Sequence, residues 1–121
     1  MPKTINEIVQ KKKQKITVVT SYDYTMATLC DQVDILLVGD SAGMVMLGYE
    51  NTAPVTMDQM CMFTEGVSNG RKSALIVADL PNKSYENESD AVTNSQRLIN
   101  AGADAVKLEG RQFYSIRTGM D

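Results

Sequence analysis

The stretch Ile35-Leu36-Leu37-Val38-Gly39-Asp40 carries the pattern that decides the fold of this chain. Its apolar run is continuous, which is typical of a strand buried on both faces of a parallel sheet. An aspartate follows the run after a single glycine. An apolar run followed by an acidic residue occurs again at residues 74–79 and 105–109. We therefore predict three such strands, each with a carboxylate at its carboxyl end.

Helical patterns lie between these runs. Thr4-Ile5-Asn6-Glu7 and Thr56-Met57-Asp58-Gln59 have the residue spacing of a capping box, so each predicts the start of a helix. Asn69-Gly70 is expected to end the second of these helices with a left-handed cap. The expected inner faces are Met57, Met60, Cys61, Thr64 and Val67 in one helix and Ala91, Val92, Ser95, Leu98 and Ile99 in the next. The full prediction is helices at 5–13, 25–32, 57–70 and from about 87 or 89 to 102, strands at 16–20, 35–38, 73–78 and 105–108, and a long loop at 39–54.

The order of these elements argues for a parallel α/β architecture in one domain. A closed (β/α)8 barrel of the TIM type needs about 250 residues, and roughly 200 is its lower bound. Four strands in 121 residues supply half of such a barrel. The pattern alone leaves two possibilities, an open parallel sheet or a part of a longer barrel.

Composition limits the function. The formal net charge of −3 and the pI near 4.9 give no electrostatic reason to expect nucleic-acid binding. The start of the chain lacks the apolar stretch of a secretory signal, and no segment reaches the roughly 18 apolar residues of a membrane span, so we expect cytoplasmic residence.

Cys30 and Cys61 have no metal-type spacing and are expected to be free thiols. Histidine is absent, so acid–base chemistry would use carboxylates, Lys, Tyr, Cys or metal-bound water.

Asp40, Asp79 and Glu109 are the strongest functional signal in the chain. Each follows a predicted strand, and the intervening segments are long enough for one helix and a return strand. Parallel strands end at the same edge of a sheet, which is where such barrels keep their chemistry. Clustered carboxylates repel one another unless a divalent cation holds them, and oxygen ligands favour magnesium. We therefore predict a Mg²⁺ site at this edge.

The sequence resembles the ketopantoate hydroxymethyltransferase family, also called 3-methyl-2-oxobutanoate hydroxymethyltransferase. Several blocks occur in family order with family-like gaps between about Thr4 and Gly110. The matching stretches are Thr20-Ser21-Tyr22-Asp23-Tyr24, Leu37-Val38-Gly39-Asp40-Ser41-Ala42-Gly43-Met44, Leu47-Gly48-Tyr49-Glu50, Pro54-Val55-Thr56, Ala78-Asp79-Leu80-Pro81 and Ala101-Gly102-Ala103-Asp104-Ala105-Val106-Lys107-Leu108-Glu109-Gly110.

The resemblance implies a (β/α)8 barrel enzyme of pantothenate biosynthesis. Such an enzyme transfers a one-carbon unit from 5,10-methylenetetrahydrofolate to 3-methyl-2-oxobutanoate, giving 2-dehydropantoate through a magnesium-stabilised enolate. It is expected to be a homo-oligomer. By resemblance, Asp40, Asp79 and Glu109 bind the metal. Ser41 and Lys107, with Asp40 and Asp79 close by, hold the keto acid.

Departures from the family pattern limit what can be carried over. The family's proton-abstracting glutamate lies on a later strand, beyond Asp121, and so does a further active-site histidine, so no catalytic residue is assigned within this chain. Met62-Phe63 stands where the family often has Tyr-His, Asn82 where it has an aromatic or aliphatic residue, and Arg111 where it has glycine. We expect residues 1–121 to form a single partial barrel domain. It would have an N-terminal helix at 1–14, four βα units at 15–110 and a divergent tail at 111–121.

Other interpretations remain open from the sequence. The chain could be another magnesium-dependent carbon–carbon lyase or mutase acting on 2-keto acids, or a catalytically incomplete half-barrel. Lys107 could be a surface lysine whose stem lies along the strand, Ser41 could only cap a turn, and Asp23 is as compatible with a helix N-cap as with a substrate contact.

Overall fold

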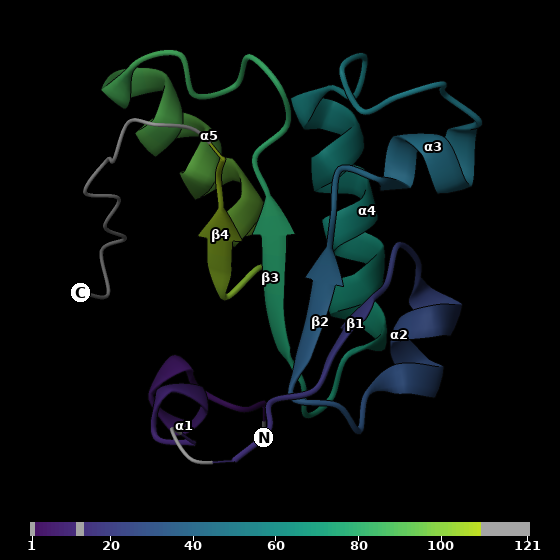
Figure 1. The fold of residues 1–121 in the computed structure, drawn as a ribbon, viewed down its shortest axis with the longest axis vertical. Coiled ribbons are helices and arrows are strands. Elements are labelled where there is room, and N and C mark those ends of the chain that lie inside the picture. Colours follow the sequence, from purple (N-terminus) through teal and green to yellow (C-terminus); the bar gives the residue numbers. More distant parts are fainter. Residues whose placement is uncertain (1, 12–13, 110–121) are drawn as a thin grey trace.

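A computed structural model describes residues 2–11 and 14–109 of the chain. Helices and strands follow one another along the sequence and build one sheet with helices beside it (Figure 1). The elements are α1 (Ile5–Val9), β1 (Val18–Thr20), α2 (Tyr24–Cys30), β2 (Ile35–Val38), α3 (Ala42–Leu47), α4 (Met57–Gly70), β3 (Leu75–Asp79), α5 (Glu88–Ala101) and β4 (Ala105–Lys107).

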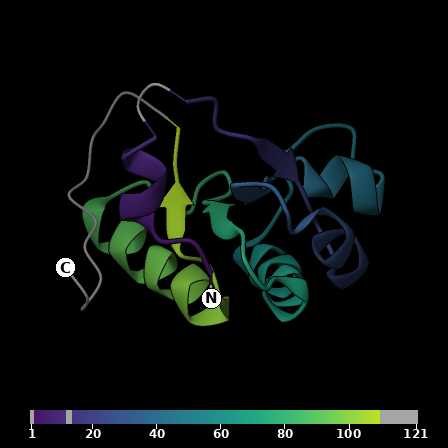
Figure 2. The same ribbon diagram turned by 90° about the horizontal axis from the view of Figure 1, so that it is seen from below.

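The sheet is parallel throughout and its strands lie in the order β1-β2-β3-β4. Each strand therefore pairs with the next one along the chain, and the connections all proceed in one direction. Right-handed crossovers of this kind place their helices on the same face of the sheet. Accordingly α2, α4 and α5 lie in a row on one side, where α4 packs against both of its neighbours (Figure 2). This one-sided arrangement is that of a barrel wall rather than of a doubly wound sheet.

The two faces of the sheet differ in burial. Leu36, Val38, Ile76 and Ala78 point to the helices and are fully buried. On the opposite face Leu37 and its register partner Val77 are only partly buried. A face that carries apolar residues and that none of the described helices covers corresponds to the interior of a barrel.

Side-chain caps begin the main helices where the sequence predicts them. Thr56 and Gln59 form the capping box of α4, with both reciprocal hydrogen bonds present. Asp23 accepts a hydrogen bond from the Met26 N–H at 2.7 Å, so it is the N-cap of α2. Asn87 caps α5 in the same way. Each cap satisfies backbone donors that have no partner within the helix.

Some predicted boundaries are wrong. The helix predicted at 5–13 ends at Val9, and Lys11 instead pairs with Asp34 at 2.7 Å, while residues 12 and 13 lie outside the described residues. The predicted loop at 39–54 contains the short helix α3, which ends at Gly48 with φ +74°. The first strand begins at Val18, the residue that pairs with the first residue of β2, and not at 16. In α5, Val92 is 39% exposed and does not belong to the inner face.

Gly70 is also a correction. It lies inside α4 without a positive φ, and the C-cap is the extended residue Arg71. A Cβ at Gly70 would lie 2.5 Å from the Tyr24 carbonyl oxygen and 3.1 Å from the Ala27 Cβ. The glycine is therefore required because α2 and α4 approach closely, and not because of a left-handed cap.

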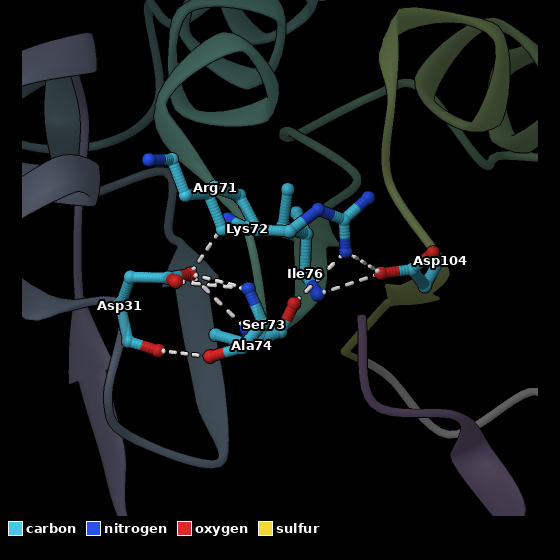
Figure 3. A network of polar contacts seen from close by, with 7 residues as sticks. All are labelled: Asp31, Arg71, Lys72, Ser73, Ala74, Ile76 and Asp104. Carbon is cyan, nitrogen blue, oxygen red and sulfur yellow. Dashed lines mark hydrogen bonds and ion pairs between the residues drawn. The ribbon is translucent and has the colours of Figure 1, made fainter. Parts of the chain in front are cut away.

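The amino end of the sheet is held by two carboxylates that each accept several hydrogen bonds (Figure 3). Asp31 accepts hydrogen bonds from the backbone N–H groups of Lys72, Ser73 and Ala74. Asp104 accepts from the Ile76 N–H at 2.9 Å and from Arg71 at 2.7 Å. These contacts tie the start of β3 to the loops on either side of it.

Candidate functional site

The opposite edge of the sheet, where the strands end, carries the candidate site. Asp40, Asp79, Lys107 and Glu109 all line one pocket of about 160 Å³. Each residue comes from a strand or from the loop that follows it, since Asp79 ends β3, Lys107 ends β4, and Asp40 follows β2. The structure thus brings the three acidic residues named from the sequence, and the lysine, to one place.

Asp79 is the central side chain of this pocket. It is 8% exposed, and its Oδ2 accepts a hydrogen bond from the backbone N–H of Asp40 at 3.1 Å. Its Oδ1 is buried and has no hydrogen-bond partner among the described residues. The Lys107 ammonium lies 3.4 Å from this oxygen, close enough for an ion pair. A buried carboxylate oxygen with an ion-pair partner but no hydrogen bond is poorly compensated.

Lys107 owes its position to the strand register. Asp79 and Lys107 are paired residues of β3 and β4, so their side chains leave the sheet on the same face. The ammonium also lies 3.6 Å from Glu109 Oε1. Burial favours the neutral amine, but the negative charges of Asp79 and Glu109 outweigh it and raise the pKa of Lys107. Lys107 is therefore a cation directed at the acids, although its side chain is 46% exposed.

The electrostatic balance of the pocket is negative. Burial, followed by the charges of Asp79 and Glu109, raises the pKa of Asp40, and Lys107 only partly opposes this effect. Three carboxylates and one ammonium leave a surplus of negative charge in a partly buried space. Such a space favours a cation.

Magnesium fits this pocket by donor type and by charge. Carboxylate oxygens are the ligands it prefers, and the buried Asp79 Oδ1 is available as a donor. The side chains are not arranged as a complete ligand set, since the described residues contain no group of three or more His, Cys, Asp or Glu placed to hold a metal ion together. Lys107 lies among the carboxylates instead.

Ser41 lies beside the pocket and is not part of its lining. Its Oγ is 2.6 Å from the Tyr22 hydroxyl. Ser41 precedes α3 as the N-cap residue but makes no side-chain capping hydrogen bond. The interpretation of Ser41 as only a turn cap is therefore not supported. Asp23, by contrast, is engaged as the α2 cap.

Several residues of the pocket were not predicted as site residues. Thr52 and Ala53 come from the segment before α4, and Asn82 and Tyr85 come from the loop between β3 and α5. Their position in loops at the carboxyl edge is the only sequence signal that could have identified them, because residues of such loops line the mouth of a barrel.

Comparison with known proteins decides the family. The sequence model described as ketopantoate hydroxymethyltransferase matches residues 2–118. The chain belongs to the ketopantoate hydroxymethyltransferase family. It is 65% identical over 115 residues to the 3-methyl-2-oxobutanoate hydroxymethyltransferase of Nitrosopumilus maritimus (strain SCM1), covering 91% of this chain and 41% of that protein. Identity to the same-named protein of Cenarchaeum symbiosum (strain A) is 63% over 101 residues, covering 83% of this chain and 38% of the relative. This member of the family thus spans about two fifths of the length of these curated relatives.

Solved structures establish the fold of this family member. It matches phosphoenolpyruvate phosphomutase from Streptomyces platensis subsp. rosaceus with a TM-score of 0.72 at 16% identity, covering 95% of this chain and 41% of that one. It matches 2,3-dimethylmalate lyase, a member of the PEP mutase/isocitrate lyase superfamily, with a TM-score of 0.63 at 19% identity, covering 88% of this chain and 38% of that one. The chain has the architecture of a partial (β/α) barrel of the TIM type. None of the described helices is long and apolar enough to cross a membrane.

Proposed function

We propose that this chain supplies the metal- and keto-acid-binding part of a 3-methyl-2-oxobutanoate hydroxymethyltransferase. The observation that carries the proposal is the pocket formed by Asp40, Asp79, Lys107 and Glu109 at the carboxyl edge of a chain from this family. The whole reaction would transfer a one-carbon unit from 5,10-methylenetetrahydrofolate to 3-methyl-2-oxobutanoate, giving 2-dehydropantoate in pantothenate biosynthesis.

In this proposal the acidic residues of the pocket bind the metal ion, and the lysine binds the carboxylate of the keto acid. Asp40, Asp79 and Glu109 would hold Mg²⁺, and Asp79 also orients the Asp40 backbone through the hydrogen bond at 3.1 Å. The bound ion supplies Lewis-acid polarisation of the keto oxygen, which makes the neighbouring C–H group more acidic. Lys107 would pair with the carboxylate of the keto acid, to which its ammonium can move from its present position between Asp79 and Glu109. Ser41 would donate a hydrogen bond to the same ligand.

Calorimetry tests the binding part of this proposal. The chain should bind Mg²⁺ alone, and it should bind 3-methyl-2-oxobutanoate only when Mg²⁺ is present. Lys107→Met keeps the length of the side chain but removes its charge, so it should weaken keto-acid binding and leave Mg²⁺ bound. A folded preparation that binds no keto acid at saturating Mg²⁺ would show that the assignment is wrong.

A second candidate is a half-barrel that binds the ligands without catalysis. The family resemblance gives none of the residues of this sequence the role of the proton-abstracting base, so binding and proton exchange have to be measured separately. Exchange of the C3 proton of the keto acid in deuterated water distinguishes the two, because exchange requires a working base. We expect binding without exchange. Rapid exchange would identify a base inside this chain.

The proposal includes assembly and location. Met44, Val45, Met46 and Leu47 of α3 are between 40% and 64% exposed, so α3 presents an apolar surface suited to contact with another copy of the chain. We therefore propose a homo-oligomer. From the composition and the net charge of −3 we further propose a cytoplasmic location and no nucleic-acid partner.

A further inference from the structure

Tyr22 makes a contact that the proposed function does not use. Its hydroxyl lies 2.6 Å from Ser41 Oγ, a short distance for a hydrogen bond between two hydroxyls. Tyr22 comes two residues after β1, and Ser41 comes three residues after β2, so the contact joins two neighbouring strand ends at the carboxyl edge. The Tyr22 ring is partly buried and packs against the hydrophobic core, which holds its hydroxyl in place.

The absence of a side chain at Gly39 leaves room for Ser41 to lie close to Asp79 of the acidic pocket. A Cβ placed on Gly39 would lie 3.3 Å from Ser41 Oγ and 3.4 Å from Asp79 Oδ2. The serine hydroxyl and the Asp79 carboxylate therefore lie near each other, beside the position that a Gly39 side chain would occupy. A ligand that reaches Asp79 from the pocket would also come near Ser41.

The direction of the hydrogen bond determines what Ser41 can offer to a ligand. A serine hydroxyl has one proton to donate and can accept two hydrogen bonds, whereas the more acidic phenol of tyrosine is the better donor. When Tyr22 donates to Ser41 Oγ, the serine keeps its own proton for another acceptor. A hydroxyl that accepts a hydrogen bond is polarised and becomes a stronger donor.

We propose that Tyr22 is a positioning residue for the binding of a 2-keto acid. The Tyr22 hydroxyl donates a hydrogen bond to Ser41 Oγ and thereby fixes the rotamer of the serine. The serine hydroxyl can then donate its own hydrogen bond to an anionic oxygen of the ligand beside Asp79. This inference rests on the proposed function, because it assumes that the keto acid binds at this edge.

A double-mutant cycle tests the inference with the 121-residue chain. The variants are Tyr22→Phe, Ser41→Ala, the double variant, and Tyr24→Phe as a matched control on a tyrosine that is 58% exposed. Calorimetry gives the Kd of Mg²⁺ alone and then the Kd of 3-methyl-2-oxobutanoate at saturating Mg²⁺. Tyr22→Phe should weaken keto-acid binding by about 3- to 10-fold, the range expected for one hydrogen bond. It should leave the Kd of Mg²⁺ unchanged, and Tyr24→Phe should change neither.

The double variant shows whether Tyr22 acts through Ser41. We expect it to bind the keto acid no more weakly than Ser41→Ala does, because Tyr22 then has no serine to orient. Unchanged binding in Tyr22→Phe, or losses that add in the double variant, would overturn the inference but leave the proposed function intact. A Tyr22→Phe chain that unfolds, or that loses Mg²⁺ binding equally, would assign Tyr22 a structural role instead. Absence of keto-acid binding in the parent chain would overturn the proposed function, and the inference with it.

Discussion

At the residue scale, the carboxylates at the two edges of the sheet differ in their hydrogen-bond partners. Asp31 and Asp104, at the amino edge, are surrounded by backbone N–H groups and an arginine. Asp79, at the carboxyl edge, has a buried oxygen without a hydrogen bond among the described residues, and the pKa of its neighbour Asp40 is raised. Satisfied carboxylates contribute stability, whereas poorly compensated ones mark a place where a ligand can bind.

Asp79→Asn should weaken Mg²⁺ binding by at least about ten-fold, because it removes a charge and the available donor oxygen. The asparagine can still accept the hydrogen bond from the Asp40 N–H, so the loop should keep its position. Asp58→Asn is the control, since Asp58 lies on α4 with its side chain 88% exposed and pairs with Arg97. Calorimetry with Mg²⁺ alone measures the Kd of Mg²⁺ for each of the two variants. Equal affinities in the two variants would contradict the role of Asp79.

The Asp31 carboxylate should stabilise the folded chain by an amount that decreases in acid. Burial raises its pKa, but hydrogen bonds from the backbone of Ala74, Ser73 and Lys72 outweigh burial, so the pKa of Asp31 lies below its ordinary value. A lowered pKa in the folded state means that the stabilisation is fully present above the unfolded pKa of about 3.9 and is lost as pH falls through the lower, folded value.

Asp31→Asn should lower the free energy of unfolding by about 1.5–3 kcal/mol at pH 7, the range for hydrogen bonds to a charged group. The difference between the variant and the parent chain should shrink below about pH 4, because Asp31 is then protonated in the unfolded chain and, at still lower pH, in the folded chain as well. Urea unfolding at a series of pH values measures this. A difference that stays constant down to pH 2 would contradict the linkage.

At the scale of elements, the contact between α2 and α4 depends on two glycines with different surroundings. A Cβ at Gly70 would lie 2.5 Å from the backbone oxygen of Tyr24, whereas a Cβ at Gly66 would have no atom nearer than 3.7 Å. Both residues lie inside α4 and face α2. The helices therefore approach most closely at the end of α4.

Gly70→Ala should destabilise the chain by about 1–3 kcal/mol, because backbone must move to admit the methyl group. Gly66→Ala should stabilise it by about 0.5–1 kcal/mol, because glycine costs conformational entropy inside a helix and the added methyl group meets ordinary contacts. Chemical denaturation of both variants and of the parent chain gives the change in the free energy of unfolding for each glycine. Changes of the same sign would show that the close approach at Gly70 does not determine the packing.

At the scale of the whole molecule, the helices α2, α4 and α5 cover one face of the sheet, and no helix among residues 2–11 and 14–109 covers the other. The helices bury Leu36 and Ile76 completely, while Leu37 and Val77 on the other face remain partly exposed. Edge strands with free backbone groups and an uncovered apolar face promote association. The partly exposed Leu37 and Val77, together with the exposed apolar residues of α3, therefore favour association of the chain.

The 121-residue chain should self-associate or melt with low cooperativity. Sedimentation should give a mass above the 13.3 kDa of one chain, rising with concentration. Val45→Lys, at a position on α3 that is 64% exposed, should reduce the mass if α3 makes the contact. A single monomeric species that melts cooperatively in calorimetry would contradict this expectation.

Much of the fold could be predicted from sequence because its signals are local. Continuous apolar runs predicted the strands, and Thr56, Asp23 and Asn87 showed where helices begin. Gly43 and Gly48 indicate a loop where the structure has α3. Gly70 indicates a left-handed cap, because the atoms that require a glycine there belong to α2 and are distant in sequence.

Local patterns were enough to predict the parallel α/β class, the family, and the placement of Asp40, Asp79 and Glu109 at strand ends, because each of these depends on residues that are neighbours along the chain. Which side chains contact one another depends on the folded arrangement. The register of β3 and β4 places Lys107 against Asp79, and adjacent strand ends place Tyr22 against Ser41. Such contacts join residues from different strands, so they depend on the packing of the whole sheet and have no local signal in the sequence.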